Sequence, residues 1–439
     1  MNQYQEILSG QSYSTAVIKL PGNFTVPVSY NIAYSFRTDK PDQLMTNIPQ
    51  DIDNLRTSDQ DEYINQIVKL INSSSKNDFE RVKKAHDLTA LVLSYDAENY
   101  WAKTIPDQSY QNTLKTSLSV CAGYANVLKK FCDELRIPCV VVSGYVRGVG
   151  TSPTAADKPN ELNHAWNIVA IYGANYLIDC TWDSGSMEGK VVEKYYCTNY
   201  LFIKPKHLIY SHFPENINHQ LLASPLSAAQ FGVLPPLKPK FFYFVSNPSI
   251  ELKKKIHVRD KMTFEYTVKE GYYLDYTVIE MKNGTEIKLD NRHFIQVNGS
   301  RHTAYFSFPS AGQYKINIYY LEYGTNEGKG CGEFIVIAAS ASKVEFPTTF
   351  LSTYTKNFEI KSPIEMPLRK GRTYTFRIKA ENKSNAIIIH GETFTLLTKK
   401  SDGTFSREVI IPNNISELSL GVADEGSSKY LIIAKYKVN

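Results

Sequence analysis

Three residues of this 439-residue chain have the types and the order of a nucleophile, a base and an orienting acid. Cys121 opens a segment whose pattern predicts a helix, and the unpaired N–H groups and dipole of a first helical turn favour a thiolate. His164 and Asp179 lie in two strand-like segments further along. A thiolate, an imidazole and a carboxylate that holds the imidazole can together make and break an acyl–sulfur bond.

The helix that carries Cys121 is predicted from apolar residues at helical spacing. Ser119 is a plausible N-cap, and Pro138 ends the helix because it disfavours a helical conformation at the preceding residue. A small buried cysteine at a helix start is also common packing, so the position of Cys121 alone does not establish catalysis.

The two strand-like segments, residues 163–171 and 176–182, predict an antiparallel hairpin around a turn at 172–175. With the hairpin centred between Tyr172 and Gly173, Asp179 is the diagonal neighbour of His164, at roughly 7–8 Å between backbones. A register centred one residue later places these two side chains on opposite faces and breaks the constellation.

Several segments around these residues resemble a known family. Residues 120–125, 163–167 and 178–183 are similar to the motifs of the transglutaminase-like superfamily, which is related to papain-type cysteine proteases. Residues 94–101, 107–114, 201–205 and 210–215 resemble the kyphoscoliosis peptidase and hillarin group within it. The resemblance covers about residues 60–216. Ser119 departs from it, since the family often has a glycine two residues before its cysteine.

The resemblance implies a role for each residue of the triad. Cys121 is the expected nucleophile, His164 the general base and acid, and Asp179 the orienting carboxylate. Asp183 is a nearby alternative acid, placed by the strand alternation on the face opposite Trp182, but the family match is in register with Asp179.

The rest of the site is less defined by the sequence. Trp166 and Trp182 are expected to wall the site as packing residues. Oxyanion donors are expected from the backbone N–H of Cys121 and from a side chain of the preceding loop, for which the candidates are Gln108, Gln111 and Trp101. No cofactor or metal site is predicted, and His207 and His212 are interpreted as surface histidines.

Length and local pattern predict several domains. The predicted fold class is α+β: a papain/transglutaminase-like core, with the cysteine-bearing helix packed on an antiparallel sheet, followed by two immunoglobulin-like β-sandwiches. Residues 1–55 are expected to form an extension or arm, 56–216 the cysteine catalytic domain, 217–239 a Pro-containing linker, and 240–340 and 341–439 the sandwiches. Helices are predicted at 61–71 and 79–92.

The sandwiches are predicted from short alternating strands separated by turn residues beyond residue 240. The segment 308–318 is typical of an immunoglobulin-like corner and strand, with Tyr314 as the corner tyrosine. Neither sandwich carries a chemical motif, so binding or spacing is their expected role.

Charge and cysteine content exclude some functions. A net charge of +5 is too small for this length to indicate nucleic acid, and the basic run at 253–259 is expected on an edge strand. No apolar stretch is long enough for a transmembrane helix, and no secretory signal is visible at the first residues. Six cysteines are sparse usage, which favours a reduced, cytoplasmic protein. The resemblance to the kyphoscoliosis peptidase group further implies cytoskeletal association.

Three functions compete at this stage. The first is a thiol enzyme acting on protein substrates through a thioester, either as a cysteine peptidase or as a protein-glutamine acyltransferase. The second is a catalytically idle scaffold that binds cytoskeletal or other protein partners, as the kyphoscoliosis peptidase group implies. The third is a secreted adhesion protein, which the missing signal sequence disfavours.

Overall fold

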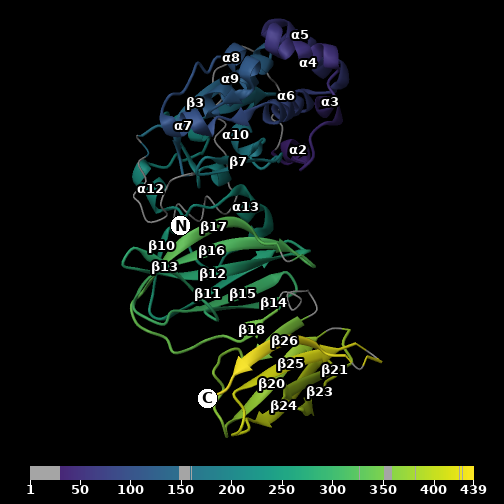
Figure 1. Ribbon diagram of the computed structural model, residues 1–439, viewed down its shortest axis with the longest axis vertical. Helices are drawn as coiled ribbons and strands as arrows, with labels where there is room; N and C mark the ends of the chain where they lie inside the picture. Colours follow the sequence, from purple (N-terminus) through teal and green to yellow (C-terminus); the bar gives the residue numbers. More distant parts are fainter. Residues whose placement is uncertain are drawn as a thin grey trace. The chain divides into compact units, whose positions relative to one another are not determined.

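The computed structural model describes residues 30–147, 159, 161–325, 327–350, 358–380, 382–424, 426–427 and 429–439. The strand-like fragments of the first 29 residues therefore lie outside the described residues. The chain divides into two compact units, Met1–Leu234 and Pro235–Asn439. Figure 1 draws the first in purple to teal and the second in green to yellow. The five-part division of the sequence at 55, 216, 239 and 340 stays a prediction.

Unit 1 contains most of the helices of the described chain (Figure 1). The predicted helices at 61–71 and 79–92 are confirmed as α5 and α6. The helices are α2 (Tyr30–Ser35), α3 (Gln43–Thr46), α4 (Gln50–Ser58), α5 (Gln60–Ser74), α6 (Asp78–Val92), α7 (Ala97–Ala102), α8 (Tyr110–Thr116), α9 (Cys121–Glu134), α10 (Cys180–Asp183), α11 (Pro205–Leu208), η1 (Ile217–Gln220) and α12 (Ala228–Val233).

The central sheet of unit 1 is antiparallel and has the strand order β5-β4-β3-β8. Its strands are β3 (Cys139–Val146), β4 (His164–Ile171), β5 (Ala174–Ile178) and β8 (His212–Pro214). Two short pairs complete the unit: β1 (Ser94–Tyr95) with β2 (Leu118–Ser119), and β6 (Gly185–Glu188) with β7 (Val191–Lys194).

The β4–β5 hairpin has the register expected from the sequence. Ile171 pairs with Ala174 and Asn167 with Ile178, so the turn is centred between Tyr172 and Gly173, and the alternative register is wrong. The second strand is shorter than predicted, because it ends at Ile178 and the chain enters α10. The sequence had suggested strand alternation for Trp182 and Asp183. This alternation does not apply, because both residues lie in α10.

The core of unit 1 lies between α9, its neighbouring helices and the sheet. Every residue of β4 is buried, and Val127, Leu128 and Phe131 of α9 are fully enclosed. Burying each such side chain contributes roughly 1.5–3 kcal/mol to stability. Ala33 and Met45 belong to the same core, so the helices of residues 30–55 pack onto it.

Unit 2 is built from strands, with α13 (Pro239–Phe244) at its start (Figure 1). Its first sandwich pairs a sheet ordered β10-β17-β16-β12-β13 with one ordered β14-β15-β11-β9. Its strands are β9 (Val245–Ser246), β10 (Lys255–Val258), β11 (Lys261–Val268), β12 (Tyr272–Lys282), β13 (Thr285–Leu289), β14 (His293–Asn298), β15 (Arg301–Ser307), β16 (Gly312–Glu322) and β17 (Lys329–Ala338).

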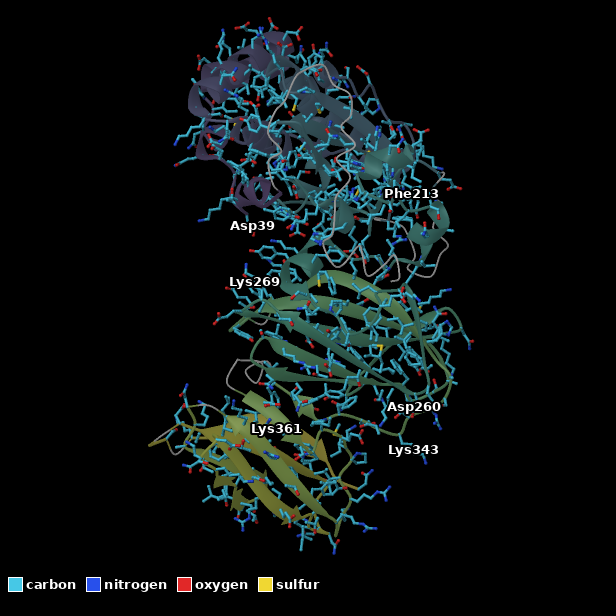
Figure 2. All side chains as sticks on the ribbon, turned by 180° about the vertical axis from the view of Figure 1, so that it is seen from behind. Asp39, Phe213, Asp260, Lys269, Lys343 and Lys361 are labelled. Carbon is cyan, nitrogen blue, oxygen red and sulfur yellow. The ribbon has the colours of Figure 1, made fainter. Side chains whose placement is uncertain are left out.

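The second sandwich follows the segment near Lys343, which is labelled in Figure 2. Its sheets are ordered β18-β26-β25-β21-β22 and β19-β20-β24-β23. Its strands are β18 (Thr348–Thr349), β19 (Phe358–Ser362), β20 (Thr373–Ala380), β21 (Asn385–His390), β22 (Thr393–Leu396), β23 (Thr398–Lys399), β24 (Thr404–Ile410), β25 (Glu417–Ala423) and β26 (Leu431–Lys437).

Side chains from facing sheets meet inside both sandwiches. Tyr276 of β12 packs against Phe306 of β15 at 5.0 Å between ring centroids, and Phe376 of β20 against Tyr436 of β26 at 5.7 Å. Tyr314 is fully buried, and its hydroxyl donates to the backbone O of Ser310 at 2.9 Å, which confirms the corner tyrosine. The chain is therefore α+β, with two immunoglobulin-like sandwiches. No helix among the described residues is long and apolar enough to span a membrane.

Candidate active site

Cys121 is the first residue of α9, but its helix is not capped by Ser119 as predicted. Val120 is the N-cap residue and makes no side-chain capping bond. The Ser119 hydroxyl instead lies 2.8 Å from Oε1 of Gln108, an oxygen that also accepts the N–H of Val120 at 3.0 Å. The preceding loop is thus tied to the residues immediately before the thiol.

The first turn of α9 approaches its neighbours closely at Gly123. A Cβ there would lie 1.9 Å from Oγ of Ser119 and 2.5 Å from Oγ1 of Thr113, so only glycine fits without displacing them. On the next turn, Nδ2 of Asn167 on β4 donates to the backbone O of Ala125 at 3.0 Å. These contacts fix the start of α9 against the sheet that carries His164.

His164 and Asp179 are hydrogen-bonded and buried. Nε2 of His164 lies 2.7 Å from Oδ2 of Asp179, with side chains 5% and 1% exposed. Asp179 is the N-cap of α10, and its Oδ1 accepts the N–H groups of Thr181 at 2.9 Å and Trp182 at 3.2 Å. This capping explains why β5 ends at Ile178, because the carboxylate starts a helical turn.

The charge state of His164 is set by two neighbours. Burial lowers the pKa of His164, but the Asp179 carboxylate and Cys121, each of which also hydrogen-bonds the ring, raise that pKa to about 10. His164 is therefore cationic near neutral pH. Since Nε2 faces Asp179, Nδ1 is the ring nitrogen left for Cys121.

Asp179 has a second histidine partner that the sequence analysis placed at the surface. His212 is 1% exposed, and its Nε2 lies 3.1 Å from the same Oδ2. Burial would raise the pKa of Asp179, but the charge of His164 and hydrogen bonds from both rings hold this pKa well below its usual range. The interpretation of His212 as a surface residue is wrong; the apolar residues around it, Ile209, Tyr210 and Phe213, could have indicated burial.

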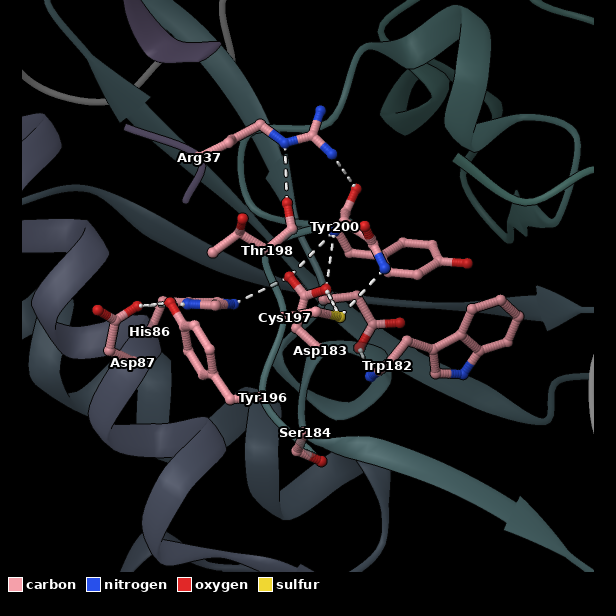
Figure 3. Close-up of polar contacts among 12 residues, drawn as sticks. Arg37, His86, Asp87, Trp182, Asp183, Ser184, Tyr196, Cys197, Thr198 and Tyr200 are labelled. Atoms are coloured by element: carbon pink, nitrogen blue, oxygen red, sulfur yellow. Dashed lines mark hydrogen bonds and ion pairs between the residues drawn. The ribbon is translucent and has the colours of Figure 1, made fainter. Parts of the chain in front are cut away.

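Asp183 belongs to a different network, drawn in Figure 3. Its Oδ2 lies 3.0 Å from Nε2 of His86, and the backbone N–H of Tyr200 donates to both of its oxygens. The other ring nitrogen of His86 lies 3.1 Å from Asp87. Cys197 places its sulfur 3.2 Å from Oδ1 of Asp183.

Aromatic rings enclose the two histidines of the site. Trp166 lies 6.1 Å and Trp182 lies 5.6 Å from the His164 ring, measured between centroids. Trp166 is buried and Trp182 half-buried. Tyr95 and Tyr100 lie near Cys121, which raises the pKa of both electrostatically, after burial as the main cause. No sequence motif marks these two tyrosines as neighbours of the thiol.

The three side chains considered as oxyanion donors have different surroundings. Gln108 contacts the residues before Cys121 through Oε1, while its Nε2 donates to the backbone O of Pro106 at 3.0 Å. Trp101 is 41% exposed and donates its indole N–H to the backbone O of Gly189 at 2.6 Å. Gln111 is exposed on α8.

One group of side chains has the composition of a metal site. Ligand atoms of His164, Asp179 and His212 lie within 4.8 Å of one another. Both Nε2 atoms are already at hydrogen-bond distance from the carboxylate, and a metal would need their lone pairs instead of their protons. The arrangement fits an acid held by two N–H donors better than it fits a metal centre.

Sequence comparisons identify the type of domain. Residues 65–180 match the family model of the transglutaminase-like superfamily. Kyphoscoliosis peptidase is 28% identical in Mus musculus and 30% in Homo sapiens, over 46% of this chain and 31% of either relative. Hillarin of Drosophila melanogaster is 25% identical over 28% of this chain and 16% of its own. The chain thus spans less than a third of the length of these relatives.

Among solved structures, a crystal structure of a TGase overlaps 31% of this chain and 34% of its own, at 17% identity and a TM-score of 0.22. The architecture described above rests on the strand pairing and packing of this chain itself.

Proposed function

We propose, starting from the transglutaminase-like domain that residues 65–180 carry, that unit 1 is a thiol enzyme acting on protein substrates. Cys121 is the nucleophile, His164 the base and acid, and Asp179 the carboxylate that orients the ring. The proposal is supported by the buried ring of His164, whose Nε2 lies 2.7 Å from Oδ2 of Asp179. Burial lowers the pKa of this ring, but Asp179 and Cys121 raise it to about 10. An imidazolium beside sulfur favours the thiolate, the nucleophilic form.

The proposed reaction has two steps. The Cys121 sulfur attacks an acyl carbon, the C–N bond breaks, and the leaving nitrogen takes a proton from Nδ1 of His164, which leaves a thioester. Water or a primary amine then gives a proton to His164 and attacks the thioester carbon, and the sulfur leaves. Water makes the domain a peptidase and an amine makes it a protein-glutamine acyltransferase. The N–H of Cys121 is the proposed oxyanion donor, since first-turn N–H groups have no intrahelical partner.

The burial of Cys121, which is 8% exposed, favours a second candidate function. In it, the domain is a catalytically idle scaffold that binds cytoskeletal or other protein partners, in the cytoplasm or on the cytoskeleton. The two functions differ in the reactivity of this thiol, so one measurement separates them.

Alkylation of the folded full chain by iodoacetamide near pH 6, followed by mass spectrometry, is the test. Cys121 should be modified at least roughly tenfold faster than the other thiols and lose this preference in His164→Ala. Cys132 is the internal control, because it is fully buried and its pKa is raised well above the usual value by a hydrogen bond with Cys139 and by burial. Equal labelling of Cys121 and Cys132 would favour the scaffold.

Acylation of Cys121 by p-nitrophenyl acetate, with and without the primary amine putrescine, separates the two reactions. Amide formation with putrescine supports acyl transfer, whereas release of acetate alone supports hydrolysis.

A further inference from the structure

One carboxylate oxygen in the candidate site is shared by two imidazoles in different states. Oδ2 of Asp179 lies 2.7 Å from Nε2 of His164 and 3.1 Å from Nε2 of His212. The proposed reaction uses His164 and leaves His212 without a role. A second histidine that is buried and hydrogen-bonded to the orienting carboxylate therefore needs its own explanation.

The sheet brings His212 to this position through β3. Gly144 of β3 lies opposite His164 of β4 on one side and opposite Pro214 of β8 on the other. Because side chains alternate along a strand, His212 shares the face of Pro214 and of His164. By the same alternation Phe213, whose place Figure 2 labels, faces the other way and packs on Phe231 at 5.1 Å between ring centroids.

Gly144 leaves the space that this arrangement requires. A Cβ at Gly144 would lie 2.4 Å from Cη2 of Trp166 and 2.5 Å from the backbone O of Phe213. Without that Cβ, the Trp166 ring reaches the His212 ring edge-on, at 5.0 Å and 90°. Trp182 packs on the same imidazole at 4.6 Å. The His212 ring is thus fixed by packing as well as by hydrogen bonds.

His212 is neutral where His164 is charged. Burial is the main cause that lowers the pKa of His212 to about 4, and the charge of His164 acts in the same direction against the hydrogen bond to Asp179. A neutral imidazole has one N–H. With Nε2–H donated to Asp179, Nδ1 carries no hydrogen, and it lies 2.8 Å from the Ser211 hydroxyl.

We propose that His212 is a positioning residue, a hydrogen-bond donor that holds the Asp179 carboxylate in place throughout the reaction. This inference rests on the proposed function. When His164 gives its proton to the leaving nitrogen, the ion pair with Asp179 becomes a weaker contact between a charge and a neutral ring. The His212 bond does not change at that moment, because this ring takes no part in the proton transfer. The carboxylate therefore stays where His164 needs it when the ring is protonated again.

The test compares two substitutions of His212 in the full chain, with acylation by p-nitrophenyl acetate as the readout. His212→Phe keeps an aromatic ring and removes the donor, whereas His212→Gln keeps an N–H donor. His212→Phe should lower the acylation rate constant roughly ten- to hundredfold, the effect of losing a hydrogen bond to a charged group, with the KM for the ester unchanged. His212→Gln should stay within about threefold of the parent.

The pH profile gives a readout that a merely structural role would not move. The groups that face the His164 ring are Cys121 from α9, Asp179 from the cap of α10 and His212 from β8. If the carboxylate drifts in His212→Phe, the basic limb of Cys121 alkylation by iodoacetamide should move to lower pH by about one unit. An unchanged limb, or equal rates in the Phe and Gln variants, would overturn the proposal.

Controls separate the failure of this inference from the failure of the proposed function. His219→Phe changes a half-buried histidine on η1 and should leave the rates of acylation and of Cys121 alkylation unchanged. Loss of acylation in His164→Ala and Asp179→Asn, with normal acylation in His212→Phe, would reject His212 alone. Normal acylation in all three variants would reject the triad. Denaturant unfolding followed by tryptophan fluorescence reports unit 1, because all three tryptophans of the chain lie there.

Discussion

The two ends of α10 each carry a buried aspartate hydrogen-bonded to a histidine, and the two networks differ in where their cysteine lies. Asp179 and Asp183 are 1% and 0% exposed. Asp179 lies 2.7 Å from His164, and Asp183 lies 3.0 Å from His86. Both networks include a cysteine, so unit 1 holds two sets of Cys, His and Asp whose aspartates are four residues apart.

The sets differ in which group the sulfur contacts. In the proposed triad Cys121 acts on the imidazole of His164, whose pKa it helps to raise, whereas the Cys197 sulfur lies 3.2 Å from the carboxylate of Asp183. A thiol that faces a carboxylate has no imidazole positioned to take its proton. The negative charge of the carboxylate also disfavours a thiolate. The contact order, thiol to ring to acid, distinguishes a candidate catalytic set from a structural one with the same composition.

Replacing Asp179 by asparagine is expected to have the largest effect. Asp179→Asn keeps the shape of the cap but stabilises neither the imidazolium nor the correct tautomer of His164, and such a swap costs about 10⁴-fold in a serine triad. The acylation rate constant with p-nitrophenyl acetate should fall on this scale while the chain stays folded. Activity within about tenfold of the parent would show that Asp179 is not the orienting carboxylate.

The next effect concerns stability as a function of pH, through the His86 network. Burial lowers the pKa of His86, but hydrogen bonds and charges from Asp183 and Asp87 raise it to about 9 from 6.5. The folded state then binds more protons than the unfolded state between these values, so this stabilisation is complete below about pH 6.5 and is lost as pH rises through 9. At 1.36 kcal/mol per unit, the loss is on the order of 3 kcal/mol.

Urea unfolding of the full chain, followed by tryptophan fluorescence at pH 6.5 and pH 9.5, measures this loss. His164 contributes in the same direction, since its pKa is also raised, so the parent chain is compared with His86→Gln. The variant should lose less stability between the two pH values than the parent. Equal losses would show that His86 is not protonated in the folded chain.

The sequence predicted what depends on local pattern. The helix that begins at Cys121, the hairpin register and the corner bond of Tyr314 all follow from periodicity, turn residues or a known motif. The end of β5 did not follow, because a capping bond from Asp179 competes with strand pairing and a strand pattern does not reveal it.

The local sequence pattern also could not predict contacts between distant segments of the chain. His212 is 33 residues from Asp179 in sequence, and only the pairing of β8 with β3 brings them together. Ser119 has a residue type suited to capping, yet its hydroxyl lies on Gln108, eleven residues earlier. Contacts with distant segments determine the hydrogen-bond partners of such polar side chains, and a single sequence contains no direct signal of these contacts.

The smallest expected effect on chemistry comes from the acid at the other end of α10. Asp183→Asn preserves the shape and can still accept the N–H of Tyr200, but it removes the charge opposite His86. Loss of one charged hydrogen bond predicts destabilisation of roughly 1–3 kcal/mol in urea unfolding. Acylation by the folded fraction should change less than about threefold, because Asp183 contacts neither His164 nor Cys121 among its described bonds. If Asp183→Asn slowed acylation more than Asp179→Asn at equal stability, the catalytic carboxylate would have to be reassigned to the His86 network.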